Sequence, residues 1–202
     1  MKEHEYIYGD YDRYKVIFWI SFFSIIISLM LAGKLDCLGL NNLKYQLKIN
    51  ISMVSIYTVL LFILSKIVWK WKVFGKIFNF PNLNGEYKVD GESVENSIGN
   101  QINWNGKIII KQTWSKILIT LQSENSKSIS ASYSAVITYI SGVGYKLEYN
   151  YMNTPNQNSN DLNMHTGNAQ ILFTKSDKYE GAYYNNFNQR KSYGIMHLTR
   201  IN

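Results

Sequence analysis

Apolar residues follow two different patterns along the chain, and the pattern changes near residue 80. The first part contains two long apolar runs, which predict transmembrane α-helices at about residues 16–33 and 49–69, since each run is long enough to cross a bilayer. Lys66 interrupts the second run, but its long side chain can reach the membrane interface. Trp69 and Trp71 suit the same interface.

Two other interpretations of these runs are weaker. The first run is too long for the apolar part of a typical signal peptide, and acidic residues precede it. Two buried core helices would need a partner domain to cover them, which the chain lacks. Ser21, Ser24 and Ser28 lie three and four residues apart in the first run. They indicate either a helix contact in lipid or ordinary tolerance of serine in a membrane helix.

After Pro81, apolar residues recur at every second position, which is typical of β-strands. Short turn sequences such as Gly142-Val143-Gly144 separate the runs, so an antiparallel meander is expected. Eight strands are predicted: 85–91, 104–112, 114–122, 127–140, 144–152, 165–175, 178–184 and 193–201. Such a meander predicts a small, roughly eight-stranded antiparallel β-barrel, with a two-layer sandwich as the alternative.

Strict alternation also predicts which residues share a face. In the strand at 127–140, one face is expected to hold alternate apolar residues, and the intervening serines to lie on the other. The predicted apolar face consists of Ile129, Ala131, Tyr133, Ala135 and Ile137.

The expected fold is therefore two N-terminal transmembrane α-helices followed by an all-β domain. We expect a membrane module at residues 1–78 and a cytoplasmic ligand-binding β-barrel at residues 79–202. Seven Lys and Arg residues flank the outer ends of the helices, against three in the connecting loop 33–48. This bias predicts a multi-pass protein of the bacterial inner membrane with both termini and the barrel in the cytoplasm.

Charge and cysteine content narrow the function classes. Residues 1–80 hold 10 basic and 5 acidic residues, whereas residues 81–202 hold 11 and 9. Because most of the net charge of +7 flanks the apolar runs, a membrane surface is the expected partner rather than DNA or RNA. The single cysteine, Cys37, excludes an intrachain disulfide.

The sequence lacks familiar signatures of catalysis. It has no phosphate-binding loop, no G-x-S-x-G motif and only three histidines, His4, His165 and His197, which are not at metal-ligand spacing. We therefore predict that the protein is not an enzyme and has no catalytic residues, no metal site and no cofactor.

The β domain is instead rich in aromatic and small polar residues, with two arginines, Arg190 and Arg200. Aromatic rings stack on nucleobases, and arginine pairs with phosphate. A row of tyrosines in a small barrel can equally be core and rim, so residues of these types alone leave a ligand pocket and a packed interior both open. The polar segment 153–163 is either a plain linker or a lid.

An ordered set of motifs adds information. These are Gly85-Glu86-Tyr87, IKQTWSKI at 110–117, SISAS at 128–132, LEYNYMN at 147–153, His165-Thr166-Gly167, YEGAYYN at 179–185 and GIMHLTR at 194–200. Together with the two helices, they make the chain resemble the SMODS-associating two-transmembrane, β-strand-rich effectors. Those effectors belong to the cyclic-oligonucleotide antiphage systems called CBASS.

The resemblance implies a function. The barrel would bind a cyclic nucleotide, expected to be a cyclic dinucleotide, made by a CD-NTase encoded nearby. Binding would drive self-association into oligomers in the inner membrane, membrane disruption and abortive-infection cell death. The alternatives are a membrane-anchored barrel that binds an apolar small molecule, and a structural membrane scaffold.

This function suggests roles for particular residues. Trp114, Tyr151 and Tyr183 are the predicted stacking residues, Arg190 is the predicted phosphate contact, and Asn153 and His165 are the predicted polar contacts.

Overall fold

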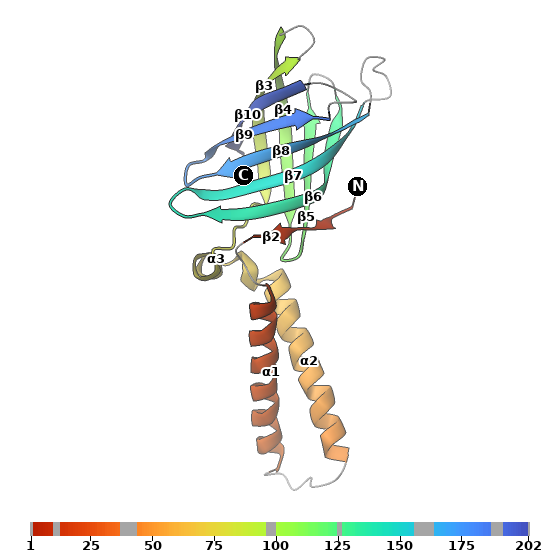
Figure 1. Ribbon diagram of the computed structural model, residues 1–202. Coiled ribbons are helices and arrows are strands. Elements are labelled where there is room, and N and C mark those ends of the chain that lie inside the picture. Colours follow the sequence, from red (N-terminus) through yellow and green to blue (C-terminus); the bar gives the residue numbers. More distant parts are fainter. Residues whose placement is uncertain are drawn as a thin grey trace. The chain divides into compact units, whose positions relative to one another are not determined.

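The protein consists of two compact units, which the computed structural model describes for residues 2–9, 13–36, 44–95, 100–124, 127–155, 164–186 and 192–201 (Figure 1). One unit, Tyr11–Phe80, is helical. The other combines Met1–Asp10 with Pro81–Asn202 and is built of β-strands. The first ten residues thus belong with the β-strands, whereas the sequence pattern grouped them with the helices.

The helical unit contains α1 (Arg13–Asp36), α2 (Lys44–Lys66), a short 3₁₀ helix η1 (Val68–Lys70) and α3 (Lys72–Phe78). The two long helices confirm the predicted pair. Asn79 adopts a left-handed conformation (φ 50°) and ends α3, a role that asparagine tolerates better than most residues. Phe80 N then donates to Gly75 O at 3.1 Å.

The two long helices are apolar and largely exposed. Only 17% of the span Arg13–Leu31 and 11% of the span Met53–Lys70 is buried, whereas a core helix of a soluble protein would be mostly covered. Both spans are long and apolar enough to cross a bilayer, so they are two candidate transmembrane helices.

Two serines of α1 are buried in the helical unit. Ser24 and Ser28 are 2% and 3% exposed, and with Val16 they form the buried side of α1, which packs on α2. Ser24 Oγ donates to Ser21 O at 2.7 Å, so its polar group is satisfied within the helix. These two small residues therefore contribute to close helix packing within one chain rather than presenting a free surface to another chain.

The β unit is a closed antiparallel barrel, as predicted. Its eight strands are β3 (Gly85–Glu95), β4 (Asn100–Gln112), β5 (Lys116–Ser123), β6 (Ile129–Ile140), β7 (Gly144–Thr154), β8 (His165–Phe173), β9 (Lys178–Asn185) and β10 (Ser192–Arg200). They follow the order β5-β4-β3-β10-β9-β8-β7-β6, and pairing between β5 and β6 closes the circle. Closure leaves the main sheet without free edges.

The seam between β5 and β6 contains an N-terminal insertion. The two strands pair directly only from Thr120↔Ala131 to Gln122↔Ile129. Elsewhere along the seam, β1 (His4–Glu5) pairs with β5, and β2 (Ile7–Tyr8) runs parallel to β6. His4 Nε2 lies 2.7 Å from Ser132 Oγ, which also accepts the Ile119 amide at 3.0 Å. The N-terminus therefore completes the barrel wall.

A β-bulge corrects the predicted faces of β6. The pairing with β7 shifts between Ser132 and Ser134, and a bulge of this kind reverses the side-chain alternation along the strand. Ile129 and Tyr133 are consequently half exposed, at 49% and 50%. The prediction that these two residues share the face of Ala135 and Ile137 is therefore wrong. Before the bulge, the buried inward positions are serines, Ser128 and Ser130.

One end of the barrel interior is filled by large side chains. Tyr87, Phe173 and Tyr179 form an aromatic cluster with ring centroids 4.8–5.8 Å apart. Burial raises the pKa of Tyr87 to about 12, and its hydroxyl donates to Leu83 O at 2.9 Å. The strands also contribute fully buried aliphatic residues to the barrel interior, Val89, Ile108, Ile117, Ile137, Leu147, Ile171 and Leu198.

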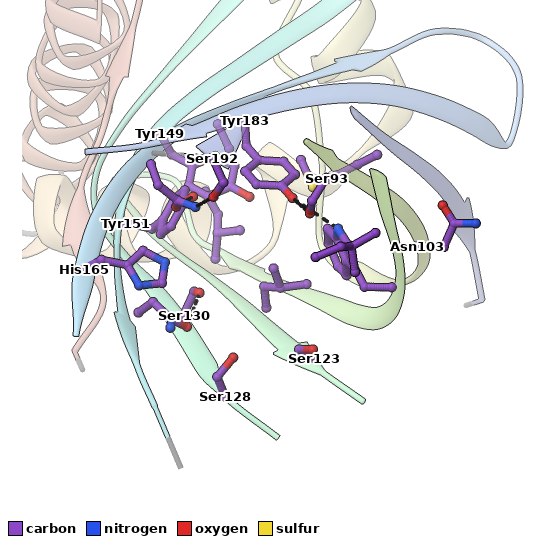
Figure 2. A pocket seen from close by; sticks show the side chains of 18 residues that line it. Ser93, Asn103, Ser123, Ser128, Ser130, Tyr149, Tyr151, His165, Tyr183 and Ser192 are labelled. Atoms are coloured by element: carbon purple, nitrogen blue, oxygen red, sulfur yellow. Dashed lines mark hydrogen bonds between the residues drawn. The ribbon is translucent and has the colours of Figure 1, made fainter. Parts of the chain in front are cut away.

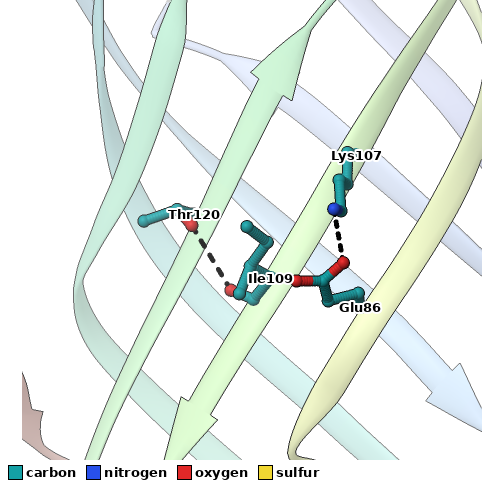
Figure 3. A network of polar contacts seen from close by, with 4 residues as sticks. All are labelled: Glu86, Lys107, Ile109 and Thr120. Carbon is teal, nitrogen blue, oxygen red and sulfur yellow. Dashed lines mark hydrogen bonds and ion pairs between the residues drawn. The ribbon is translucent and has the colours of Figure 1, made fainter. Parts of the chain in front are cut away.

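Polar side chains on the outer face of the barrel contact one another across neighbouring strands. Lys107 of β4 forms an ion pair with Glu86 of β3, and Thr120 Oγ1 donates to Ile109 O across the β4–β5 pair (Figure 3). These side chains are exposed or part-buried, and exposed ion pairs contribute little stability. They mark this face as the solvent side of the sheet.

The side chain of Gln112, on β4, is hydrogen-bonded to the N-terminal segment and to the segment that precedes β3, at the filled end of the barrel. Its side-chain oxygen accepts the Leu83 amide at 2.8 Å, and its nitrogen donates to Tyr6 Oη at 3.0 Å and to Pro81 O at 3.2 Å. The residue is 4% exposed, so each of these groups would lack water as a substitute partner.

We therefore expect Gln112→Leu to lower the free energy of unfolding of the barrel by about 1–3 kcal/mol, because it leaves the buried Leu83 amide without a partner. The measurement is the urea midpoint of the β-sheet circular dichroism signal, with full-length protein in detergent micelles. Gln122→Leu, on the exposed side of β5, is the matched control. Equal midpoints for the two variants would contradict the role of Gln112.

Candidate functional site

A cavity occupies the end of the barrel opposite the aromatic cluster, and all eight barrel strands contribute to its lining (Figure 2). It lies where β5, β7 and β9 end and where β6, β8 and β10 begin. Several inward positions here carry small polar residues, such as Ser93, Ser130 and Ser192, where the filled end has aliphatic residues. This change in side-chain size leaves space inside a barrel that is otherwise packed.

One wall of the cavity is a pair of hydrogen-bonded aromatic residues. Trp104 Nε1 donates to Tyr183 Oη at 3.1 Å, and the two rings meet edge to face with centroids 5.9 Å apart. Ser93 Oγ is also hydrogen-bonded to Tyr183 Oη. These contacts fix the position of both rings without any charged group.

A second polar chain crosses from β7 to β10. Tyr151 Oη donates to Asn185 Oδ1 at 2.7 Å, and Asn185 Nδ2 donates to Ser192 Oγ (Figure 2). These two hydrogen bonds fix the orientation of the Asn185 side-chain amide. The second hydrogen on Nδ2 and the second lone pair on Oδ1 therefore point in fixed directions.

A third group of polar residues lies on β6, β7 and β8. Ser130 Oγ donates to Asn153 Oδ1 at 2.9 Å, and Asn153 is the cross-strand partner of His165. All three residues are buried and line the cavity. They place hydroxyl, amide and imidazole groups side by side.

The described lining of the cavity combines a mainly aromatic and aliphatic surface with hydroxyl, amide and imidazole groups, and it carries no formal charge. It contains no Lys, Arg, Asp or Glu side chain. Burial raises the pKa of Tyr149, which also lines the cavity, so this phenol stays neutral at physiological pH. Among the described residues, no group of three His, Cys, Asp or Glu side chains lies close enough to hold a metal ion. The arrangement suits recognition by stacking and hydrogen bonding.

The structure brings together four of the six predicted contact residues. Tyr151, Asn153, His165 and Tyr183 all line the cavity, although they come from three different strands. Arg190 lies outside the described residues.

Trp114 is placed elsewhere. It lies in the turn before β5, is 6% exposed and does not line the cavity. Tyr6 Oη approaches Trp114 O at 3.4 Å, so Trp114 packs where the N-terminal segment meets the barrel. The predicted strand 114–122 begins at Lys116, so Trp114 precedes the strand. It lies in the turn next to the Gln112–Ile117 pair, at the filled end of the barrel and away from the cavity.

The sequence pattern missed Trp104, Asn185 and the lining serines. The inward position of Trp104 could have been predicted from the sequence. Trp104 is separated from the buried Ile108 and Ile110 by an even number of positions along β4, so it lies on the same inward face. Asn185 and the serines have no such signal, because polar residues at strand ends are also common in turns.

Two comparisons with known proteins agree with this geometry. A family model described as "Cap15, cyclic dinucleotide receptor domain" matches residues 78–200, which include all eight strands of the barrel. A protein of Yersinia aleksiciae named "CD-NTase-associated protein 15" is 35% identical over 210 aligned residues, which cover 100% of this chain and 99% of that protein. The resemblance to CBASS effectors is thereby confirmed, and the chain belongs to the Cap15 family of proteins with a cyclic dinucleotide receptor domain.

Proposed function

We propose that this protein is a membrane-anchored receptor, not an enzyme, whose barrel cavity binds a cyclic dinucleotide. The observation that carries the proposal is the neutral cavity of aromatic, amide and hydroxyl groups within the segment that matches the receptor family. Such a lining offers surfaces for stacking on two bases and hydrogen-bonding groups for their edges.

Particular residues would carry recognition. Tyr183 and Tyr151 offer aromatic surfaces, and each is held by its own chain of hydrogen bonds. Asn153, Asn185 and His165 offer donors and acceptors. A cyclic dinucleotide can hydrogen-bond to the amide and hydroxyl groups of the lining as well as stack on its rings, whereas an apolar ligand can use only the aromatic and aliphatic part. The polar groups of the lining therefore favour a nucleotide over a lipid.

The two phosphates of such a ligand need their own partners. Since the described lining has no cation, hydroxyl, amide and imidazole groups would contact them. Arg190, two residues before the lining residue Ser192, remains our proposed cationic contact. Unchanged affinity in a folded Arg190→Ala variant would remove Arg190 from the site.

The helical unit would provide the effector part of the function. We propose that α1 and α2 span the bacterial inner membrane, with both termini and the barrel in the cytoplasm. A CD-NTase encoded nearby would make the ligand, and binding would drive self-association, membrane disruption and death of the infected cell. Ligand can drive assembly only if it binds the assembling state more tightly than the resting state.

The direct test is a titration of the full-length protein in detergent micelles with a panel of cyclic dinucleotides and trinucleotides. The full chain is required because β1 and β2 belong to the barrel. We expect tight binding of one cyclic dinucleotide and none of its linear counterpart. If a demonstrably folded protein binds no member of the panel, the receptor proposal is rejected.

The ligand that binds is then added to liposomes that contain the protein and a self-quenching dye. Release of the dye, together with a ligand-dependent increase in cross-linked oligomers, is the result expected of an effector. Binding without either response would leave a receptor whose output is not membrane disruption.

We expect Tyr183→Leu to weaken binding about 5- to 150-fold, because stacking of one base on an aromatic ring is worth about 1–3 kcal/mol. Tyr184→Leu is the matched control, since the next residue along β9 is 59% exposed and does not line the cavity. Isothermal titration of both variants provides the comparison. Equal affinities would show that Tyr183 does not contact the ligand.

A further inference from the structure

Five neighbouring strands of the barrel each carry a glycine at an inward position. They follow one another around the wall in the order β8, β9, β10, β3 and β4. The five residues are Gly167, Gly181, Gly194, Gly91 and Gly106. None of them has a left-handed backbone, since the glycines with positive φ are Gly85, Gly142 and Gly144 in the described part of the chain. Conformation therefore does not require glycine at these five positions, so the reason must be space.

Aromatic side chains fill the space next to three of these glycines, and each is the direct cross-strand partner of its glycine. Trp104 pairs with Gly91, Tyr183 with Gly194, and Tyr151 with Gly167. A Cβ on Gly91 would overlap three atoms of the Trp104 indole, the farthest at 2.7 Å. A Cβ on Gly194 would lie 2.8 Å from Tyr183 Cε1 and Oη, and one on Gly167 would lie 2.5 Å from Tyr151 Cζ and Oη.

Each ring thus lies across the neighbouring strand, against the barrel wall. Trp104 of β4 lies over β3, and Tyr183 of β9 lies over β10. Because β3 and β10 are adjacent, two side chains from strands that are not neighbours reach one another and form their hydrogen bond. We call Trp104 and Tyr183 the aromatic panel.

We propose that Gly91 and Gly194 are specificity-determining residues of the cavity: they let the aromatic panel lie against the wall, which keeps the space beside it open to a ligand of dinucleotide size. This inference rests on the proposed function only for the identity of the ligand. With a Cβ at position 91, the backbone of β3 blocks the indole on one side, so the ring must move toward the barrel axis. That movement narrows the cavity and breaks the bond from Trp104 Nε1 to Tyr183 Oη.

Gly91→Ala is the informative variant. The three nearest atoms to its added Cβ all belong to the side chain of Trp104, whereas a Cβ on Gly194 or Gly167 would also overlap a backbone carbonyl oxygen. Trp104→Ala removes the obstructing ring, so the double variant Gly91→Ala/Trp104→Ala isolates the contact. Gly9→Ala is the control substitution, because its Cβ would meet its nearest atom at an ordinary 3.4 Å.

The first measurement needs no ligand. Full-length protein is labelled with 5-fluorotryptophan, and the ¹⁹F resonance of Trp104 is identified by its absence in Trp104→Ala. We expect Gly91→Ala to shift this resonance and Gly9→Ala to leave it in place. An unmoved resonance in Gly91→Ala would overturn the positioning role.

The second measurement is affinity for the cyclic dinucleotide that the wild-type protein binds most tightly in the panel. We expect Gly91→Ala to weaken binding at least about tenfold in the wild-type background, and to have no further effect in the Trp104→Ala background. An equal loss in both backgrounds would show that Gly91 acts through something other than the indole and would overturn the inference.

The two proposals can fail separately. If the wild-type protein binds no cyclic nucleotide but Gly91→Ala moves the indole, the proposed function fails and the positioning role of the glycine stands. If the wild-type protein binds and Gly91→Ala changes neither the resonance nor the affinity, the function stands and the inference fails.

Discussion

The limited space inside an eight-stranded barrel is the constraint on which the rest of this structure depends. Such a barrel is just wide enough for its inward side chains to fill it. At one end, Ile, Leu, Phe and Tyr residues do so, and their burial provides the main stabilisation of the unit. At the other end, serine, asparagine and glycine at several inward positions leave a cavity between the aromatic and aliphatic side chains that also line it. The filled end and the cavity therefore differ in how many of their inward residues are small.

The barrel closes at the seam between β5 and β6, and the N-terminal strands β1 and β2 pair with these same two strands. β5 and β6 are held directly by only three residue pairs, and β1 and β2 supply the remaining contacts. Leu121 and Ser130, which form one of those three pairs, both line the cavity. The strands that border the cavity at this point are thus the strands that hold the N-terminal segment.

The main elements of the fold could be predicted from the sequence because each rests on a local, periodic signal. Two long apolar runs give α1 and α2, and eight runs of period two give β3 to β10. The missed elements lack that signal: β1 and β2 have two residues each, and the bulge in β6 depends on its partner β7. The bulge also explains why Ser128 and Ser130 of SISAS, expected on the face opposite the apolar residues, line the cavity instead.

The candidate site was predictable only in part for a related reason. The function implied by the family resemblance, together with the chemistry of aromatic and polar side chains, predicted Tyr151, Asn153, His165 and Tyr183 as contact residues, and all four line the cavity. Their convergence depends on barrel closure, which no single segment encodes. Trp104 and Trp114 show the difference, because they lie at opposite ends of β4 and only the assembled barrel has its cavity at the end that holds Trp104.

The position of the cavity restricts how binding can affect the helices. The chain enters the barrel at Gly85, where β3 begins, and this is the filled end next to Leu83, Gln112 and Tyr87. The cavity lies at the other end, so a ligand bound there would not touch the segment that leads from α3. Any effect of the proposed ligand on the helices would have to pass along strands whose interior is close-packed, and packed interiors transmit small displacements because they have few voids to absorb them. The seam offers a second route, since β2 ends at Tyr8 and α1 begins at Arg13. Any change in the spacing of β5 and β6 at the cavity thus acts on the strands that hold the chain just before the first helix.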